Sequence, residues 1–398
     1  MAAAVAGAAA VGFGRLCDGA AGFHAALAHT AAVAGLAVLP IGLVLAAWAA
    51  RRFAPHASGG GVAQVIAAAE DPRRLPDDPR VSLRTALVGG VLCLVLFACG
   101  ASIGPEGPTV QLSAALAAWL LGSRVPGRRA LLAAGGAAGL AAAFNTPLAG
   151  VVFAVEELAP GLPRGGARAV LLGVAVAALA AWGLNGDYVY FGRVAAPALT
   201  SAWLAAPVAG LVAGLLGALF ARALKSLAGP QPGALGRLRA RRPMAFALGC
   251  AIVATAAAAV GGLTYGTGST EARALVHGAP AHGVVFALLK WLATLAAVTA
   301  GGPGGLLAPV LATGAGVGAA LSRLLWFAAV GDVVALSMTA SLAGVTQSPF
   351  TSAVLVLELT RDPGLAGPLI IAGVIGQTVS ARVSGRPLYE ALAQVQAA

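Results

Sequence analysis

Long apolar runs separated by short polar connections fill most of this sequence. A straight helix needs about 20 apolar residues to cross a bilayer. Several of these runs are shorter, and others contain an internal proline or glycine. Helices of uneven length with internal breaks are typical of membrane transporters. The pattern therefore predicts an all-α polytopic membrane protein of tilted and broken helices. The apolar runs are at residues 24–50, 84–103, 109–122, 130–158, 168–185, 196–224, 243–265, 282–300, 305–330, 332–358 and 363–382.

The composition supports a membrane-embedded chain. Of its 398 residues, 59% are hydrophobic and 10% are charged, whereas a soluble protein has about 25% charged residues. The 55 glycines indicate close helix–helix contact through small residues. A genome of high GC content, which writes alanine and glycine often, is the alternative explanation for this bias.

The net charge of +11 has two interpretations. Arginines in the predicted connections, such as Arg128 and Arg237, indicate loops that are retained on the cytoplasmic side of the plasma membrane. A basic vestibule that attracts anions is the second interpretation. We expect no nucleic-acid partner, because the sequence has no long soluble basic segment.

Two passages of the first half recur in the second half. Residues 145–158 resemble residues 347–360 at nearly the same offset as a second, glycine-rich pair. Duplicated halves with breaks at corresponding positions predict a binding site between the repeats. We therefore expect one transport domain over residues 1–398, with inverted repeats at about 24–185 and 196–382 and a boundary near 186–200. The aligned anchors are Pro147 with Pro349, Glu156 with Glu358, and residues 104–107 with 302–305.

Glu106 is the most informative single residue. It lies in a glycine- and proline-rich break, residues 100–108, between two apolar runs. A carboxylate inside a membrane span costs roughly 3 kcal/mol on insertion scales. Backbone without helical hydrogen bonds is tolerated at membrane depth only inside protein or beside a wet cavity. The setting indicates a titratable group beside an ion path, and the alternative is a solvent-exposed carboxylate at a helix end.

Three breaks precede helical runs, at residues 58–61, 104–108 and 301–305. A helix that starts in such a break directs free N–H groups and the positive end of its dipole into the break. Several such ends would bind an anion, whereas a cation would require oxygen ligands. Simple notches for helix packing are the alternative explanation for the glycines.

In order and spacing, these segments resemble the CLC family of chloride channels and anion/proton exchangers. The stretch Ser58-Gly59-Gly60-Gly61 resembles the first family signature, usually Gly-Ser-Gly-Ile-Pro. The stretch Gly104-Pro105-Glu106-Gly107-Pro108 resembles the second, usually Gly-Lys/Arg-Glu-Gly-Pro. The stretch Gly304-Gly305-Leu306-Leu307-Ala308-Pro309 resembles the third, usually Gly-Gly-Ile-Phe-Ala-Pro. Residues 137–158 and 385–389 also fit, and the resemblance extends from about Ala31 to Leu392.

The resemblance implies a homodimer of the bacterial type, without cytoplasmic CBS domains, with one pathway in each subunit. Glu106 would be the gate that competes with the anion and carries the proton. Glu157 would be the internal proton-transfer glutamate. The remaining residues that the resemblance assigns to the anion site are Gly60, Gly61, Gly107, Tyr389 and the backbone N–H groups of Leu306 and Leu307.

Three positions depart from the family pattern. Gly60 replaces the signature serine, Leu307 replaces the phenylalanine, and Pro105 replaces the lysine or arginine. Fluoride exporters and some nitrate exchangers of the family also depart at the serine. The passenger anion is therefore open among chloride, fluoride and nitrate.

The leading hypothesis is exchange of chloride or a similar small anion for protons. A passive anion channel of the same fold is the nearest alternative. An intramembrane hydrolase that uses Glu156 and Glu157 is less favoured, because adjacent positions of a helix point about 100° apart. We expect no enzyme activity, no cofactor and no metal.

Two further groups of charged residues have structural interpretations. Glu156 and Glu358 recur at equivalent positions of the two halves, which favours a role at helix ends. Lys290 lies well inside an apolar run, so its ammonium group must find a partner, line water or reach the interface.

Overall fold

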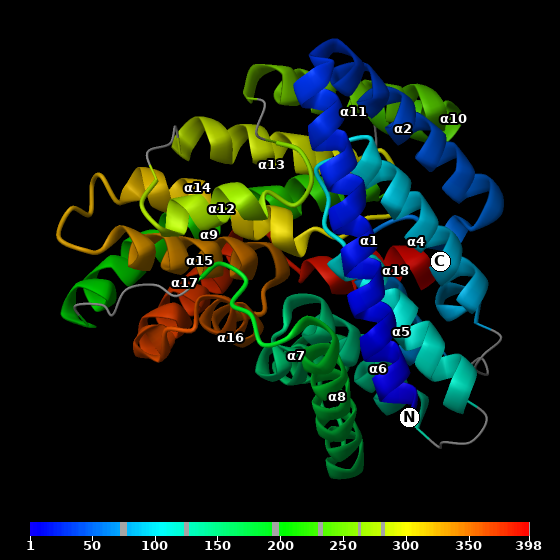
Figure 1. The fold of residues 1–398 in the computed structure, drawn as a ribbon, viewed down its shortest axis with the longest axis horizontal. Coiled ribbons are helices and arrows are strands. Elements are labelled where there is room, and N and C mark those ends of the chain that lie inside the picture. Colours follow the sequence, from blue (N-terminus) through cyan, green and yellow to red (C-terminus); the bar gives the residue numbers. More distant parts are fainter. Residues whose placement is uncertain are drawn as a thin grey trace.

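The computed structural model describes residues 1–71, 78–122, 127–192, 199–229, 234–261, 264–279 and 283–397. Within these ranges the chain is helical, and the strand-like pairing consists of two isolated bridges (Figure 1). The prediction of an all-α fold is confirmed. The helices are α1 (Ala2–Thr30), α2 (Ala32–Phe53), α3 (Val62–Glu70), α4 (Leu83–Ala98), α5 (Glu106–Leu121), α6 (Arg128–Phe144), α7 (Pro147–Phe153), α8 (Arg164–Asn185), α9 (Leu199–Ala228), α10 (Ala234–Arg241), α11 (Pro243–Gly261), α12 (Ser269–Val276), α13 (Gly283–Thr299), α14 (Leu307–Leu321), α15 (Val330–Thr346), α16 (Pro349–Thr360), α17 (Ala366–Ser384) and α18 (Leu388–Ala397).

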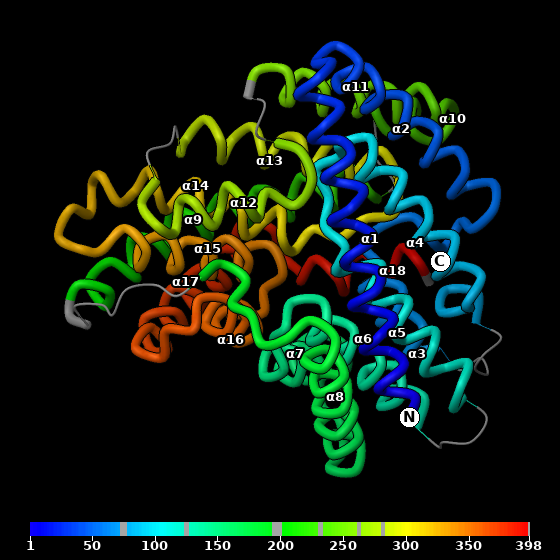
Figure 2. Tube along the Cα trace, viewed as in Figure 1, coloured from blue at the N-terminus to red at the C-terminus, as the bar shows by residue number. Residues whose placement is uncertain are grey.

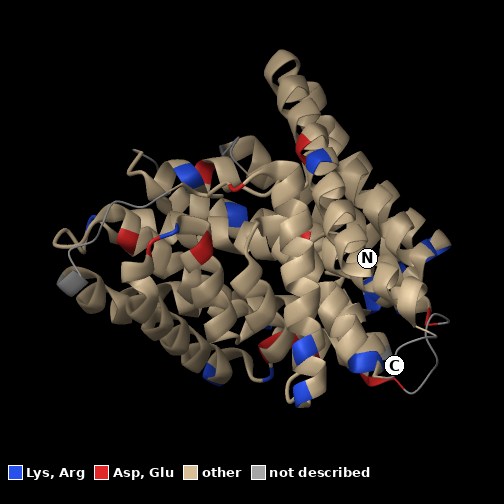
Figure 3. Ribbon diagram, turned by 60° about the horizontal axis from the view of Figure 1, so that its bottom comes forward, with Lys and Arg blue, Asp and Glu red and all other residues tan. Residues whose placement is uncertain are grey.

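Helix lengths are uneven, as the apolar pattern predicts. In the described part of the chain, five helical segments are long and apolar enough to cross a membrane. They lie in α2, α8, α9, α11 and α17. Other apolar helices, such as α14 and α16, have only 15 and 12 residues. Charged residues are sparse and lie mainly near helix ends and connections (Figure 3).

Glycines allow close contacts where the long helices cross. α9 packs against α15 and α17. A methyl group placed on Gly214 of α9 would lie 2.5 Å from the Cα atom of Gly376 in α17. A methyl group on Gly344 of α15 would lie 3.1 Å from the Cα atom of Gly214. These backbones can approach because no side chain separates them, so the glycines have a packing role.

Some of the apolar runs are each divided between two helices. The run at 24–50 is not one element, because α1 ends at Thr30 and α2 begins at Ala32. The Thr30 hydroxyl donates to the carbonyl groups of Ala26 and Leu27, and such local bonds compete with helix continuation. The run at 332–358 likewise divides, between α15 and α16.

The N-terminal helix is an integral part of the fold. α1 packs against α4, α5, α6 and α8 and buries Ala10, Phe13 and Cys17. In Figure 2 it crosses the view beside the cyan connection between α4 and α5. The expected boundary between the halves, 186–200, falls partly on residues 193–198, which lie outside the described residues.

Candidate functional site

Two backbone bridges bring the three glycine-rich breaks together. The Gly104 N–H group donates to the Gly305 carbonyl at 2.8 Å, and the Gly305 N–H group donates to the Gly104 carbonyl at 2.6 Å. A second bridge joins Gly59 to Pro303. Segments that lie far apart in the sequence therefore meet at one place.

Three helices start at this meeting point, namely α3, α5 and α14. Gly61 precedes α3 with a φ of 73°, a conformation that favours glycine. A methyl group on Gly61 would lie 2.5 Å from the carbonyl carbon of Gly107, and one on Gly107 would lie 3.2 Å from the Cα atom of Gly305. The backbones of the three helix starts are thus in direct contact. Leu306 and Leu307 are the cap and first residue of α14, so their N–H groups belong to the same cluster.

Glu106 is the first residue of α5 and is 1% exposed. The alternative interpretation, a solvent-exposed carboxylate at a helix end, is therefore wrong. Its side chain turns back over the break, where a methyl group on Gly305 would lie 2.6 Å from Oε2. The carboxylate approaches the N–H group of Ala308, but neither oxygen has a hydrogen-bond partner in good geometry among the described residues. A buried charge without partners is unfavourable, so this carboxylate is suited to bind a proton or to move.

Tyr389 adjoins the cluster from α18. Its ring is fully buried, and its Cε1 atom would lie 3.9 Å from a methyl group placed on Gly60. Tyr389 is also within electrostatic range of both Glu157 and Glu106. The ring therefore adjoins the helix starts at Gly60.

The chain matches a known protein family. Residues 42–381 match the family model described as voltage gated chloride channel. The chain belongs to the voltage-gated chloride channel family.

Solved structures of this family have the same fold. A slow cyanobacterial Cl⁻/H⁺ antiporter has a TM-score of 0.82 at 23% identity, with 100% of this chain and 97% of that chain covered. A CLC-type fluoride/proton antiporter has a TM-score of 0.81 at 22% identity, with 98% and 96% covered. A eukaryotic CLC transporter has a TM-score of 0.78 at 21% identity, with 99% of this chain and 73% of that chain covered. The expected membership of the voltage-gated chloride channel family is confirmed.

Glu157 lies on a π-helical turn, Ala154–Leu158, that continues α7. Such turns are rare and are frequent at functional sites. The Glu157 carboxylate is 8% exposed and accepts a hydrogen bond from the Ser348 hydroxyl, at the start of α16. Ser348 could not be predicted from the sequence, since its role depends on how α7 and α16 are placed.

Glu156 and Glu358 have the helix-end role that their repetition favoured. Oε2 of Glu156 accepts from the N–H group of Thr351, at the start of α16, at 2.6 Å. Oε2 of Glu358 accepts from the N–H group of Ala149, at the start of α7, at 2.7 Å. Carboxylates at helix N-termini satisfy free N–H groups and interact favourably with the dipole. The two glutamates therefore join α7 and α16 reciprocally.

A cavity of about 630 Å³ adjoins Glu157. It is also lined by Glu156, Arg80, Arg129 and Glu390. Glu156 and Glu157 are thus both among the residues that line this cavity, but they have different partners, the Thr351 N–H group and the Ser348 hydroxyl.

Lys290 is fully buried and donates to backbone carbonyl groups. Its Nζ atom lies 3.0 Å from the Thr264 carbonyl oxygen and 2.6 Å from that of Gly266. Lys290 therefore anchors the segment that precedes α12, which agrees with the structural interpretation.

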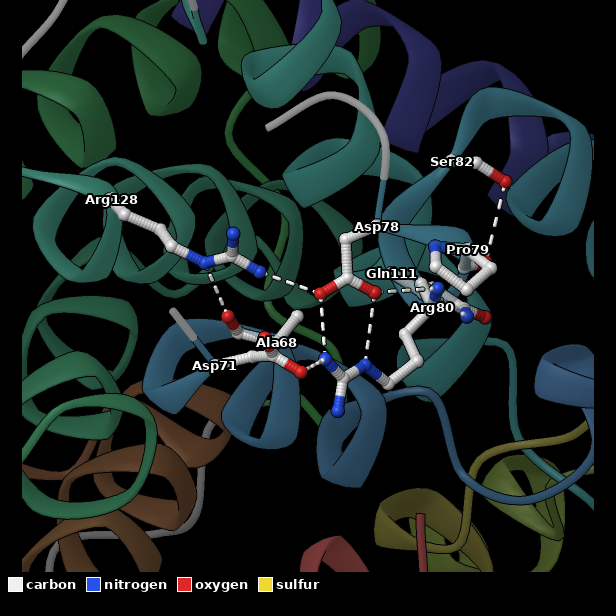
Figure 4. A network of polar contacts seen from close by, with 8 residues as sticks. All are labelled: Ala68, Asp71, Asp78, Pro79, Arg80, Ser82, Gln111 and Arg128. Atoms are coloured by element: carbon white, nitrogen blue, oxygen red, sulfur yellow. Dashed lines mark hydrogen bonds and ion pairs between the residues drawn. The ribbon is translucent and has the colours of Figure 1, made fainter. Parts of the chain in front are cut away.

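A buried charge network holds the far end of α3 (Figure 4). Asp78 is 0% exposed and accepts from Arg80 at 2.7 Å and from Arg128 of α6 at 2.6 Å. Arg128 also donates to the carbonyl group of Ala68 in α3, and Gln111 of α5 donates to that of Arg80. From the sequence, Arg128 was expected to be a loop charge, because the sequence does not reveal which carboxylate it meets.

Proposed function

We propose that this chain is a secondary active transporter that exchanges chloride, or a similar small anion, for protons across the plasma membrane. The observation that carries the proposal is the buried Glu106 carboxylate, which has no hydrogen-bond partner in good geometry among the described residues and lies at the meeting point of α3, α5 and α14. Positive helix ends that converge on one point would hold an anion without a full positive charge. Such binding is weak enough for release, which transport requires.

Glu106 serves as gate and proton carrier in this proposal. The ionised carboxylate occupies the place beside Gly305 and Gly107, where it competes with an anion for the same helix ends. A bound proton removes this competition, so the side chain leaves and an anion enters. One proton and the anion thereby alternate at a single place, which is the basis of coupling.

Glu157 would transfer the proton between Glu106 and the cytoplasm. It lines a cavity and lies within electrostatic range of Tyr389. Tyr389 and the N–H groups of Leu306 and Leu307 would contact the anion. The second candidate is a passive anion channel, and Glu157 favours exchange because a channel has no need of a second buried carboxylate.

Flux into proteoliposomes tests the proposal. An imposed chloride gradient should drive protons uphill in vesicles that contain the wild-type protein. Glu106→Gln should keep anion flux and lose proton movement, because the amide cannot bind and release a proton. Asp187→Asn is the matched control, since Asp187 is 56% exposed.

Two outcomes would contradict the proposal. Wild-type anion flux that never moves protons uphill would establish a channel. Unchanged proton coupling in Glu106→Gln would remove Glu106 from the mechanism. Parallel efflux measurements with fluoride, chloride and nitrate would identify the passenger, which Gly60 and Leu307 leave open.

A further inference from the structure

The starts of α7 and α16 have the same backbone geometry. Thr146 caps α7 with φ −128° and ψ 78°, and Ser348 caps α16 with φ −112° and ψ 83°. Each follows a residue with positive φ and precedes a proline. The preceding residues are Asn145 and Gln347, and the prolines are Pro147 and Pro349. The two cap hydroxyls are therefore comparable groups on equivalent backbones.

The two hydroxyls nevertheless have different partners. Ser348 Oγ donates to Glu157 Oε1. Thr146 Oγ1 is buried and has no hydrogen-bond partner among the described residues. The position that corresponds to Glu157 in the second half is Leu359, which cannot accept a hydrogen bond. The Ser348 bond is thus a difference between the halves and not a requirement of the cap geometry.

The start of α16 binds both Glu156 and Glu157. Glu156, the adjacent residue, accepts from the N–H groups of Phe350 and Thr351. Ser348 binds Glu157 itself, at the edge of the cavity. The ionisable groups that share this cavity are Glu70, Asp71, Arg80, Arg129, Glu156 and Glu390, with Tyr389 near Glu157 as well.

We propose that Ser348 is a positioning residue for proton transfer by Glu157. A hydroxyl group donates to an ionised carboxylate and accepts from a protonated one, so the bond can persist in both states. It holds the carboxyl group at the edge of the cavity while the proton arrives and leaves. The inference rests on the proposed exchange function, because Glu157 carries protons only in an exchanger.

Three variants test this role, with proton and chloride fluxes measured in the same vesicles. Ser348→Ala should lower proton flux about tenfold, the effect of one hydrogen bond to a charged group, and retain chloride flux. Ser348→Thr should retain both fluxes, because Thr146 shows that threonine fits this backbone. Thr146→Val, the matched control, removes an unpartnered hydroxyl and should change neither flux.

Each result decides the inference. A lower proton-to-chloride ratio in Ser348→Ala, restored in Ser348→Thr, supports it. A wild-type ratio in Ser348→Ala, or an equal loss of both fluxes, overturns it, and exchange by the wild-type protein would still stand. If Ser348→Ala does not fold, Ser348→Cys replaces it, because cysteine has a side chain of similar size with a weaker hydrogen-bond donor. An unchanged proton-to-chloride ratio in Ser348→Cys would overturn the inference. Failure of exchange itself appears in the wild-type protein, without any variant.

Discussion

Gly60 stands at the position where the family signature usually has a serine, and its surroundings leave room for that side chain. A methyl group on Gly60 would lie 3.9 Å from Tyr389 Cε1, which is ordinary contact. Its φ is not positive, whereas those of Gly59 and Gly61 are. The missing hydroxyl is therefore a chemical difference that the backbone does not impose.

Gly60→Ser should raise chloride affinity about fivefold, because an added hydrogen bond contributes about 1 kcal/mol. The hydroxyl would lie beside Tyr389, at the helix starts that we assign to the anion. Titration calorimetry with chloride measures the change directly, and fluoride and nitrate titrations would reveal any altered preference.

Gly61→Ser is the contrasting variant. Gly61 has positive φ and would place a methyl group 2.5 Å from the Gly107 carbonyl carbon, so this protein should fold poorly. Unaltered affinity for all three anions in a folded Gly60→Ser protein would show that Gly60 does not line the anion site.

At the scale of elements, α3 is fixed at both ends. Its start contacts α5 through Gly61 and Gly107, and its end is held by the Asp78 network. Burial opposes the charge of Asp78, but hydrogen bonds from Arg80 outweigh this effect and lower the pKa of Asp78. A carboxyl group with a lowered folded-state pKa contributes stability above its unfolded pKa and loses it as the pH falls through the folded-state pKa.

Asp78→Asn should therefore lower the free energy of unfolding by about 3 kcal/mol, because it leaves a buried guanidinium without its main partner. The difference from wild type should be constant from pH 8 to pH 5. It should shrink only below about pH 4, the ordinary value for an aspartate. Thermal unfolding in mild detergent, measured across this pH range, checks both statements.

The exposed pair of Arg361 and Asp187 supplies the control. Asp187→Asn should change stability by less than about 1 kcal/mol, because solvent screens such a pair. Equal effects of the two substitutions would mean that the Asp78 network does not fix α3.

The sequence predicted the features that depend on local chemistry. The glycine-rich breaks marked the starts of α3, α5 and α14, and the repeated Glu156 and Glu358 indicated helix-end roles. It could not predict features that depend on contacts between distant elements. Ser348 meets Glu157 only because α7 and α16 pack together, and the π-helical turn has no glycine or proline to mark it. The break at Ala31 was missed although the polar residues His29 and Thr30 directly precede it.

At the scale of the whole molecule, α7 and α16 present an unusual surface. Together with its π-helical turn, α7 has 12 residues, as does α16. Each is therefore about 18 Å long, which is shorter than the roughly 30 Å hydrocarbon core of a bilayer. Leu148 and Phe350 are 62% and 52% exposed beside the partly exposed Glu156 and Glu358. Helix ends and carboxylates are costly in lipid. A second copy of the chain would cover them with protein.

We therefore expect a homodimer with twice the chain mass of 38.7 kDa that is formed through α7 and α16. The double variant Leu148→Trp, Phe350→Trp should shift it toward monomer, because bulky side chains disturb a close-packed interface by about 1–3 kcal/mol yet remain compatible with lipid. Light scattering in mild detergent measures the protein mass. Leu211→Trp on α9, where Leu211 is 55% exposed, is the control and should stay dimeric. The expectation is contradicted if the wild-type protein is monomeric, or if the double variant is as dimeric as this control. In either case α7 and α16 would not form the dimer interface.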